Sequence, residues 1–159
     1  MTGKKVHVAH LEMSVSERFA GPAYEMAIGP LADTTVNHWA DAVDRAAEPS
    51  LVIDDHAVIA AVSVAACELF GFADPQSATG LCLHDGILPL VDFTAAASPL
   101  PDTERMKIPS IQALLSERLA RGLLRVRLGD DISTVDAVAT PLVDGDAVVG
   151  SLTFFCTVR

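Results

Sequence analysis

Short segments in the last two thirds of the chain alternate apolar and polar residues with the period of a β-strand. Residues 51–54 and 58–62 are rich in β-branched side chains, and the intervening DDHA favours a turn through its aspartates. These two segments therefore predict a hairpin. Near the C-terminal end, 124–128, 133–143 and 147–158 alternate in the same way and are separated by GDD and DGD. We expect these segments to form three antiparallel strands.

The alternation also predicts which side chains share a face of the sheet. A shift in register by one residue would send every side chain to the opposite face, so the apolar residues of neighbouring strands should stay together. Pairing 124 with 137, and 137 with 154, satisfies this condition. The expected inner face carries Leu124, Val126, Val135, Ala137, Ala139, Leu152, Phe154 and Cys156. The expected outer face carries Arg125, Arg127, Asp136, Ser151, Thr153 and Phe155.

An amphipathic helix is predicted before the first hairpin, over residues 31–47. Val36, Trp39 and Val43 recur there at steps of three or four, while charged residues occupy other positions. Glu48–Pro49 ends the helix, because the residue before a proline is forced out of the helical region. The helix therefore presents one apolar face.

Short helices are predicted after the hairpin. Ser63 can cap a helix over 64–70, which Gly71 ends. Asp74–Pro75 begins another helical turn, since proline fits the first helical position. Residues 81–109 show no clear period, and no structure is predicted for them.

The best-defined helix is predicted to open at Pro109–Ser110 and to end at Gly122. Its leucines and isoleucine fall at helical spacing and are expected to face the core. These residues are Ile111, Leu114, Leu115 and Leu119.

Composition and charge exclude several classes of protein. The 159 residues suit one domain, and no apolar stretch approaches the ~18 residues of a membrane-spanning helix. The N-terminal sequence lacks the apolar run of a secretory signal, so a cytoplasmic protein is expected. The formal net charge of −10 repels nucleic-acid phosphates. Cys67, Cys82 and Cys156 have no C-x-x-C spacing, so neither disulfides nor structural zinc are expected.

Two stretches resemble the ends of a PAS domain. LVIDDHAVIAAVSVAACELFGF is similar to the opening hairpin and the short helix that ends in Leu-Phe-Gly-aromatic, and VDAVATPLVDGDAVVGSLTFFCTV is similar to the last hairpin. The resemblance implies an α+β fold, in which a five-stranded antiparallel sheet carries short helices and one longer helix on one face, around a small apolar cavity. It also implies an N-terminal flanking amphipathic helix. The resulting divisions are a tail at 1–13, a helical extension at 14–48 and a PAS-like domain at 49–159.

The resemblance further implies a ligand site in the cavity, with His84 as its polar anchor. The walls are expected to come from Phe70, Cys82, His84, Leu114, Val126, Phe154 and Cys156. The cofactor, if any, stays unknown. Flavin is disfavoured because the Asn-Cys-Arg-Phe-Leu-Gln run of flavin photosensors is absent, and haem is not expected because the predicted long helix has no histidine. No catalytic residue and no metal site is predicted.

Three functions are compatible with the sequence. The first is a bacterial sensory or signalling module that binds a small apolar or amphipathic molecule and acts through a partner. The second is a ligand-free module for dimerisation or docking, and the third is a cone-shaped isomerase-like enzyme that uses His84 and Asp85 for acid–base chemistry. No enzyme motif is present, so an enzyme is not expected.

Assembly is expected as a homodimer, or as a heterodimer with another signalling protein. An apolar helix face and an aromatic side chain on a polar sheet face are typical of interfaces. The expected contact residues are Val36, Trp39, Val43 and Phe155. The alternative is that the 31–47 helix packs on its own sheet and hides Trp39.

Overall fold

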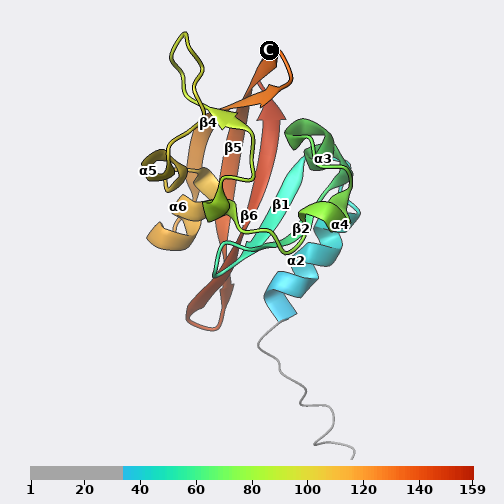
Figure 1. Cartoon of the computed structure of the whole chain (residues 1–159). Coiled ribbons are helices and arrows are strands. Elements are labelled where there is room, and N and C mark those ends of the chain that lie inside the picture. Colours follow the sequence, from blue (N-terminus) through green and yellow to red (C-terminus); the bar gives the residue numbers. More distant parts are fainter. Residues whose placement is uncertain (1–33) are drawn as a thin grey trace, which may run out of the picture. The chain divides into compact units, whose positions relative to one another are not determined.

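One antiparallel sheet of six strands runs through the part of the chain that the structure describes, residues 34–159 (Figure 1). In this computed structural model the strand order is β2-β1-β6-β5-β4-β3. The strands are β1 Ser50–Asp54, β2 Ile59–Val62, β3 Leu90–Val91, β4 Ala120–Leu128, β5 Asp131–Asp144 and β6 Ala147–Thr157. The helices are α2 Thr34–Asp44, α3 Val64–Phe70, α4 Pro75–Ala78, α5 Asp102–Arg105 and α6 Pro109–Ser116, with a 3₁₀ turn η2 at Leu83–Asp85.

This architecture confirms the α+β fold expected from the sequence. The short strand β3 is added to the five expected strands. The predicted tail at 1–13, and the part of the 14–48 extension before residue 34, lie outside the described residues.

The predicted caps define α3 and α4. The Ser63 hydroxyl accepts a hydrogen bond from the Ala66 amide at 3.2 Å, and Gly71 ends α3 with φ +76°. The Asp74 carboxylate accepts from the Ser77 amide at 2.7 Å, and Pro75 begins α4. These side-chain to backbone bonds satisfy the amides that a helix start leaves unpaired.

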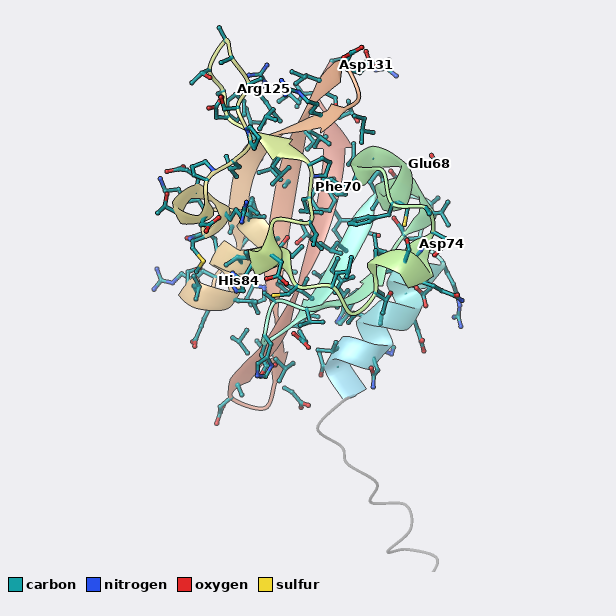
Figure 2. All side chains as sticks on the ribbon, in the orientation of Figure 1. Glu68, Phe70, Asp74, His84, Arg125 and Asp131 are labelled. Carbon is teal, nitrogen blue, oxygen red and sulfur yellow. The ribbon has the colours of Figure 1, made fainter. Side chains whose placement is uncertain are left out.

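The main core lies between the sheet and α3, α4, η2 and α6. Phe70 of α3 points toward the sheet (Figure 2) and meets Phe155 of β6 edge to face, with 4.9 Å between ring centroids. Ile111 of α6, Val126 of β4 and Val135 of β5 are buried in the same cluster. This group of residues is called the inner core below.

A second core lies on the opposite, outer face of the sheet, beneath α2. Val36 and Val43 are 8% and 2% exposed and pack against a cluster that includes Val52 and Leu152. A side chain at Gly150 would collide with the Ile53 carbonyl oxygen and approach α2, so glycine is needed for this close contact. Val36 and Val43 are therefore buried within one chain, and their assignment to an intermolecular interface is wrong.

A β-bulge near the last turn changes the register of β5 and β6. Next to the turn, Val143 pairs with Val148, in the predicted register. One step further, Leu142 pairs with Gly150, which leaves Val149 without a partner. The extra residue inverts the faces of the rest of β6.

The inversion corrects several sequence-based assignments in β6. Ala137 pairs with Phe155, so Phe155 is 4% exposed in the inner core and is not available as an interface residue. Phe154 is 47% exposed and Cys156 is also exposed, both on the outer face, so neither lines an inner cavity. Ser151 and Thr153 are buried on the inner side, and Leu152 packs beneath α2.

The register of β4 and β5 keeps the predicted faces but is shifted by two residues. Leu124 pairs with Val135 rather than with residue 137. An even shift preserves the side of each side chain, so the residues predicted inward from these two strands are buried. The predicted register would have placed Arg125 opposite Asp136, but Arg125 pairs with Thr134. Asp136 is bound by Arg121 instead, whose Nε donates to the carboxylate at 3.0 Å.

Helix α6 ends earlier than the sequence predicts. Glu117 follows Ser116 with φ +56°, and β4 already begins at Ala120. Leu115 and Leu119 are 62% and 66% exposed, so their placement on the core face is wrong. Pairing of residues 120–123 with β5 outweighs the local helical pattern.

Residues 81–109, for which no structure was expected, contain η2, β3 and α5. Among the described residues, no helix is both long and apolar enough to cross a membrane.

Candidate functional site

An apolar pocket of about 250 Å³ lies beside the edge strand β3. Its walls come from η2, β3, β4, α5, the segment before α5 and the residue that precedes α6. Most of the lining is aliphatic and includes Leu83, Leu88, Leu90, Leu100 and Ile108. Ligand sites in proteins are typically concave and apolar with a few polar groups, and this pocket fits that description.

Main-chain pairing holds the outer wall of the pocket in place. Leu90 and Val91 pair with Val126 and Arg125 of β4. The Leu100 amide donates to the Leu90 carbonyl at 3.0 Å, which adds a further extended segment beyond β3. The wall is therefore continuous with the main sheet.

The loop that joins these segments is organised around Asp92. Its carboxylate accepts hydrogen bonds from the Thr94 hydroxyl at 2.6 Å, the Thr94 amide at 3.0 Å and the Ser98 amide at 3.2 Å. These bonds, led by the one from the Thr94 hydroxyl, hold the pKa of Asp92 below its ordinary value, although partial desolvation opposes them. The Asp92 carboxylate therefore holds the loop in its conformation.

Arg125 secures the same loop from β4, as its position in Figure 2 shows. Its Nη1 donates to the carbonyls of Asp92 and Thr94 at 2.9 and 3.0 Å. The guanidinium carbon also lies 5.7 Å from the centroid of the exposed Phe93 ring. Arg125 is therefore committed to a structural role.

Two other arginines line the pocket, Arg105 and Arg127. Arg105 is paired with Asp102, with 2.6 Å between Nη1 and Oδ1. A Cβ at position 86 would lie 2.5 Å from the Arg105 Cζ, so Gly86 lets the guanidinium lie against the backbone. For Arg127, no ion pair or side-chain hydrogen bond is found among residues 34–159. The lining contains no carboxylate.

A second, more polar opening of about 400 Å³ lies between the first hairpin turn and α6. His84 and Leu114, both predicted to bind a ligand, line it together with His56 and Glu117. His84 and Asp85 are exposed and make no hydrogen bond with each other, so they do not form an oriented acid–base pair.

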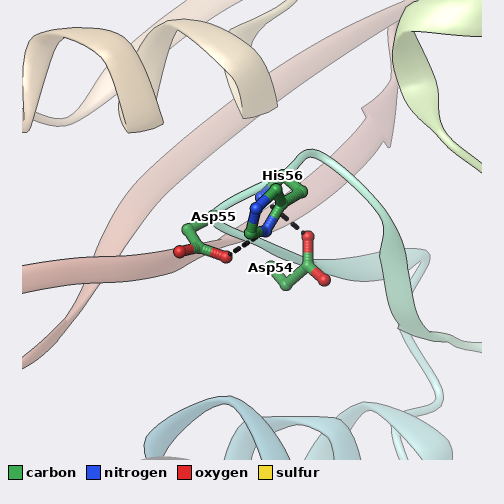
Figure 3. A group of neighbouring side chains, drawn as sticks. All are labelled: Asp54, Asp55 and His56. Atoms are coloured by element: carbon green, nitrogen blue, oxygen red, sulfur yellow. Dashed lines mark hydrogen bonds and ion pairs between the residues drawn. The ribbon is translucent and has the colours of Figure 1, made fainter.

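Asp54, Asp55 and His56 cluster at the edge of this opening (Figure 3). Asp54 Oδ1 accepts from the amides of His56 and Val58, each at 2.9 Å, and so closes the hairpin turn. His56 Nδ1 lies 2.7 Å from Asp55 Oδ1 in a solvent-exposed pair. The cluster is explained by turn formation.

The structure does not bring the predicted ligand residues together. Phe70 and Val126 are packed in the inner core, and the half-buried Cys82 has its sulfur 3.8 Å from the His56 carbonyl oxygen. Phe154 and Cys156 lie on the other side of the sheet. Only His84 and Leu114 share an opening.

Solved structures provide an independent comparison. The sequence matches no family model and no curated protein. In three dimensions the chain resembles a PAS domain from Colwellia psychrerythraea, with a TM-score of 0.53, 18% identity, and coverage of 77% of this chain and 95% of that one. It also resembles the PAS domain of Bordetella pertussis BvgS, with a TM-score of 0.52, 11% identity, and coverage of 77% and 84%.

The chain has the PAS fold.

A third similar structure is the Vibrio cholerae VqmA dimer, with a TM-score of 0.56 and 15% identity. The match covers 77% of this chain but only 51% of the VqmA chain, which is described as a dimer in the absence of its target DNA, in the context of LuxR-type receptors. Another VqmA structure is described as bound to DPO. At these identities the likeness concerns the fold alone.

The apolar pocket was missed by sequence reasoning. In this PAS fold it is built almost entirely from residues 83–108, the segment without a clear period. The apolar stretch ILPLV between Gly86 and Asp92 is a signal that favours a strand. The close contact between Arg105 and Gly86 could not be predicted, because no local sequence pattern links these two positions.

Proposed function

We propose that this PAS-fold chain is a sensory or signalling module that binds a small apolar or amphipathic molecule in the apolar pocket. The observation that carries the proposal is the pocket itself, a concave and mostly aliphatic site with Arg105 and Arg127 among the residues that line it. Its position against β3 and β4 couples it to the main sheet. The proposed signal passes from the occupied pocket through this sheet to a partner bound on it.

The proposed output is assembly with a second copy or with another signalling protein. Three side chains on the outer face form the surface in question, which we call the outer patch: Leu123, Val138 and Phe154. Leu123 and Phe154 are 53% and 47% exposed, and Trp39 of α2 is 38% exposed. Exposed large apolar side chains beside polar residues favour a protein interface.

Native mass spectrometry tests ligand binding. Protein purified under non-denaturing conditions is expected to retain a non-covalent small molecule, and Leu100→Trp, which fills the pocket, is expected to remove it. Leu119→Trp is a matched control, because Leu119 is exposed and lies outside both openings. Retention that is unaffected by Leu100→Trp would place the ligand elsewhere.

The second candidate function is a docking module without a ligand. The observation that favours it is the packing of Phe70 against Phe155, which fills the centre between helices and sheet with side chains. In that case partner binding would be the same in wild type and Leu100→Trp, whereas changes in the outer patch would abolish it.

A further inference from the structure

We propose that the apolar pocket selects a small amphipathic carboxylate, an inference that rests on the ligand-binding function proposed above. The hydrocarbon part of the ligand lies against the leucines of the pocket. The carboxylate meets Arg105 and Arg127 at its wall.

Charge is the first argument. The whole chain carries a formal net charge of −10, yet the pocket is lined by two arginines and no acidic residue. A local positive field in an acidic protein attracts an anion to that place. Because apolar walls exclude water, ion pairing inside the pocket is stronger than on the open surface.

The second argument is how the three arginine side chains of β4 are paired. Arg121 is bound to Asp136, and Arg125 to two backbone carbonyls. By contrast, Arg127 has no ion pair among the described residues. Its donors are therefore available to a ligand.

Arg105 also retains capacity for an anion. Its side chain is 26% exposed, whereas its partner Asp102 is 88% exposed at the surface. A guanidinium has five N–H donors, and the bond to Asp102 leaves several of them free. The planar group can therefore bind Asp102 and a ligand carboxylate together.

The volume and the lining of the pocket indicate the size and the chemical nature of the ligand. A volume of about 250 Å³ suits roughly eight to ten non-hydrogen atoms, given that a water molecule takes about 30 Å³ of liquid volume. The aliphatic lining favours a hydrocarbon chain or ring over a sugar or nucleotide. A planar guanidinium matches a carboxylate in a two-bond geometry, which makes a carboxylate the proposed anion.

The experiment is an NMR titration of the full-length ¹⁵N-labelled chain with octanoate, 1-octanol and octyl phosphate. Octanoate is expected to shift the amide signals of Leu88, Leu90 and Leu100, and to bind about tenfold or more tightly than octanol, since a charge-assisted hydrogen bond contributes about 1.5–3 kcal/mol. Arg127→Gln and, separately, Arg105→Gln should weaken octanoate binding by about tenfold and leave octanol binding unchanged. Arg118→Gln is the control, because Arg118 is exposed and lines neither opening.

Each other outcome has a distinct meaning. If octanol binds as tightly as octanoate, or if both arginine variants keep full octanoate affinity, the pocket binds apolar molecules but does not select an anion, and the inference is wrong. Tighter binding of octyl phosphate than of octanoate would replace the carboxylate with a phosphate. If none of the three binds, both the inference and the proposed ligand site fail. Unchanged amide spectra away from the pocket would show that the variants are folded.

Discussion

Phe154 and Phe155 are adjacent in sequence but lie on opposite sides of the sheet. Phe155 is 4% exposed against Phe70, and Phe154 is 47% exposed. We expect Phe155→Ala to lower the free energy of unfolding by about 3–5 kcal/mol and Phe154→Ala by less than about 1 kcal/mol. Urea denaturation measures both. Equal losses would contradict the register of β6.

Asp136 provides a prediction on pH. The hydrogen bonds from Arg121, followed by its charge, hold the pKa of Asp136 below the ordinary value, against partial desolvation. A depressed pKa in the folded state stabilises the protein above the unfolded value of about 3.9. That contribution is lost as pH falls through the lower, folded pKa.

The measurement is an NMR titration of the Asp136 side-chain carboxyl carbon. Arg121→Gln is expected to raise this pKa toward its ordinary value, while Arg118→Gln leaves it in place. A pKa that does not respond to Arg121→Gln would rule out the arginine as the cause.

At the scale of elements, α6 is joined to β6 by buried hydroxyl groups. Ser110 Oγ lies 2.7 Å from Thr153 Oγ1, and the Ser151 hydroxyl donates to the Ser110 carbonyl at 2.8 Å. Thr153→Val removes one partner and keeps the shape, so the buried Ser110 hydroxyl loses its bond. We expect a loss of about 1–3 kcal/mol in the free energy of unfolding.

Thr157→Val is the matched control for this change, because Thr157 is an exposed residue of the same strand. Thermal unfolding is measured for both variants and for the double variant Ser110→Ala/Thr153→Val. In the double variant no hydroxyl is left unpaired, so the comparison separates the effect of the lost Ser110–Thr153 hydrogen bond from that of a changed side-chain shape. If the double variant is not more stable than Thr153→Val, the hydroxyl bond is not the cause.

Helix α2 has one side buried against the sheet and another side exposed to solvent. Val43 is buried beneath the helix, while Trp39 keeps 38% of its surface exposed. Val43→Ala is expected to cost about 1–3 kcal/mol in the free energy of unfolding, from lost burial. Trp39→Ala should lower the free energy of unfolding by less than Val43→Ala does. Chemical denaturation measures both losses. A larger loss for Trp39→Ala would contradict the packing of α2 through Val43.

At the scale of the whole molecule, we expect two chains to associate through the outer patch. Light scattering at micromolar concentration should show a dimer, and Phe154→Lys should convert it to a monomer without lowering the melting temperature. Leu119→Lys is the control, since Leu119 is 66% exposed and is not one of the three residues of the outer patch. A monomeric wild type, or a Phe154→Lys dimer, would contradict assembly through this face.

The sequence by itself determined the elements whose signals are local. The bounds of α3 follow from Ser63 and Gly71, and the start of α4 follows from Asp74, because each of these residues acts on backbone groups a few positions away. The alternation of residues identified the strands, and parity placed the inward side chains of β4 and β5 correctly. The PAS-like α+β class was implied by the resemblance of residues 51–72 and 135–158 to the two ends of a PAS domain.

The tertiary structure alone decided what depends on distant partners. The bulge beside Val149 inverts β6, because pairing with β1 and β5 sets its faces and the turn sequence does not. Strand pairing begins at Ala120 and so ends α6 before Leu119 can join a helix. The apolar pocket exists because β3 adds to β4 and Arg105 lies against Gly86. Both contacts involve residues 81–109, whose local pattern has no clear period.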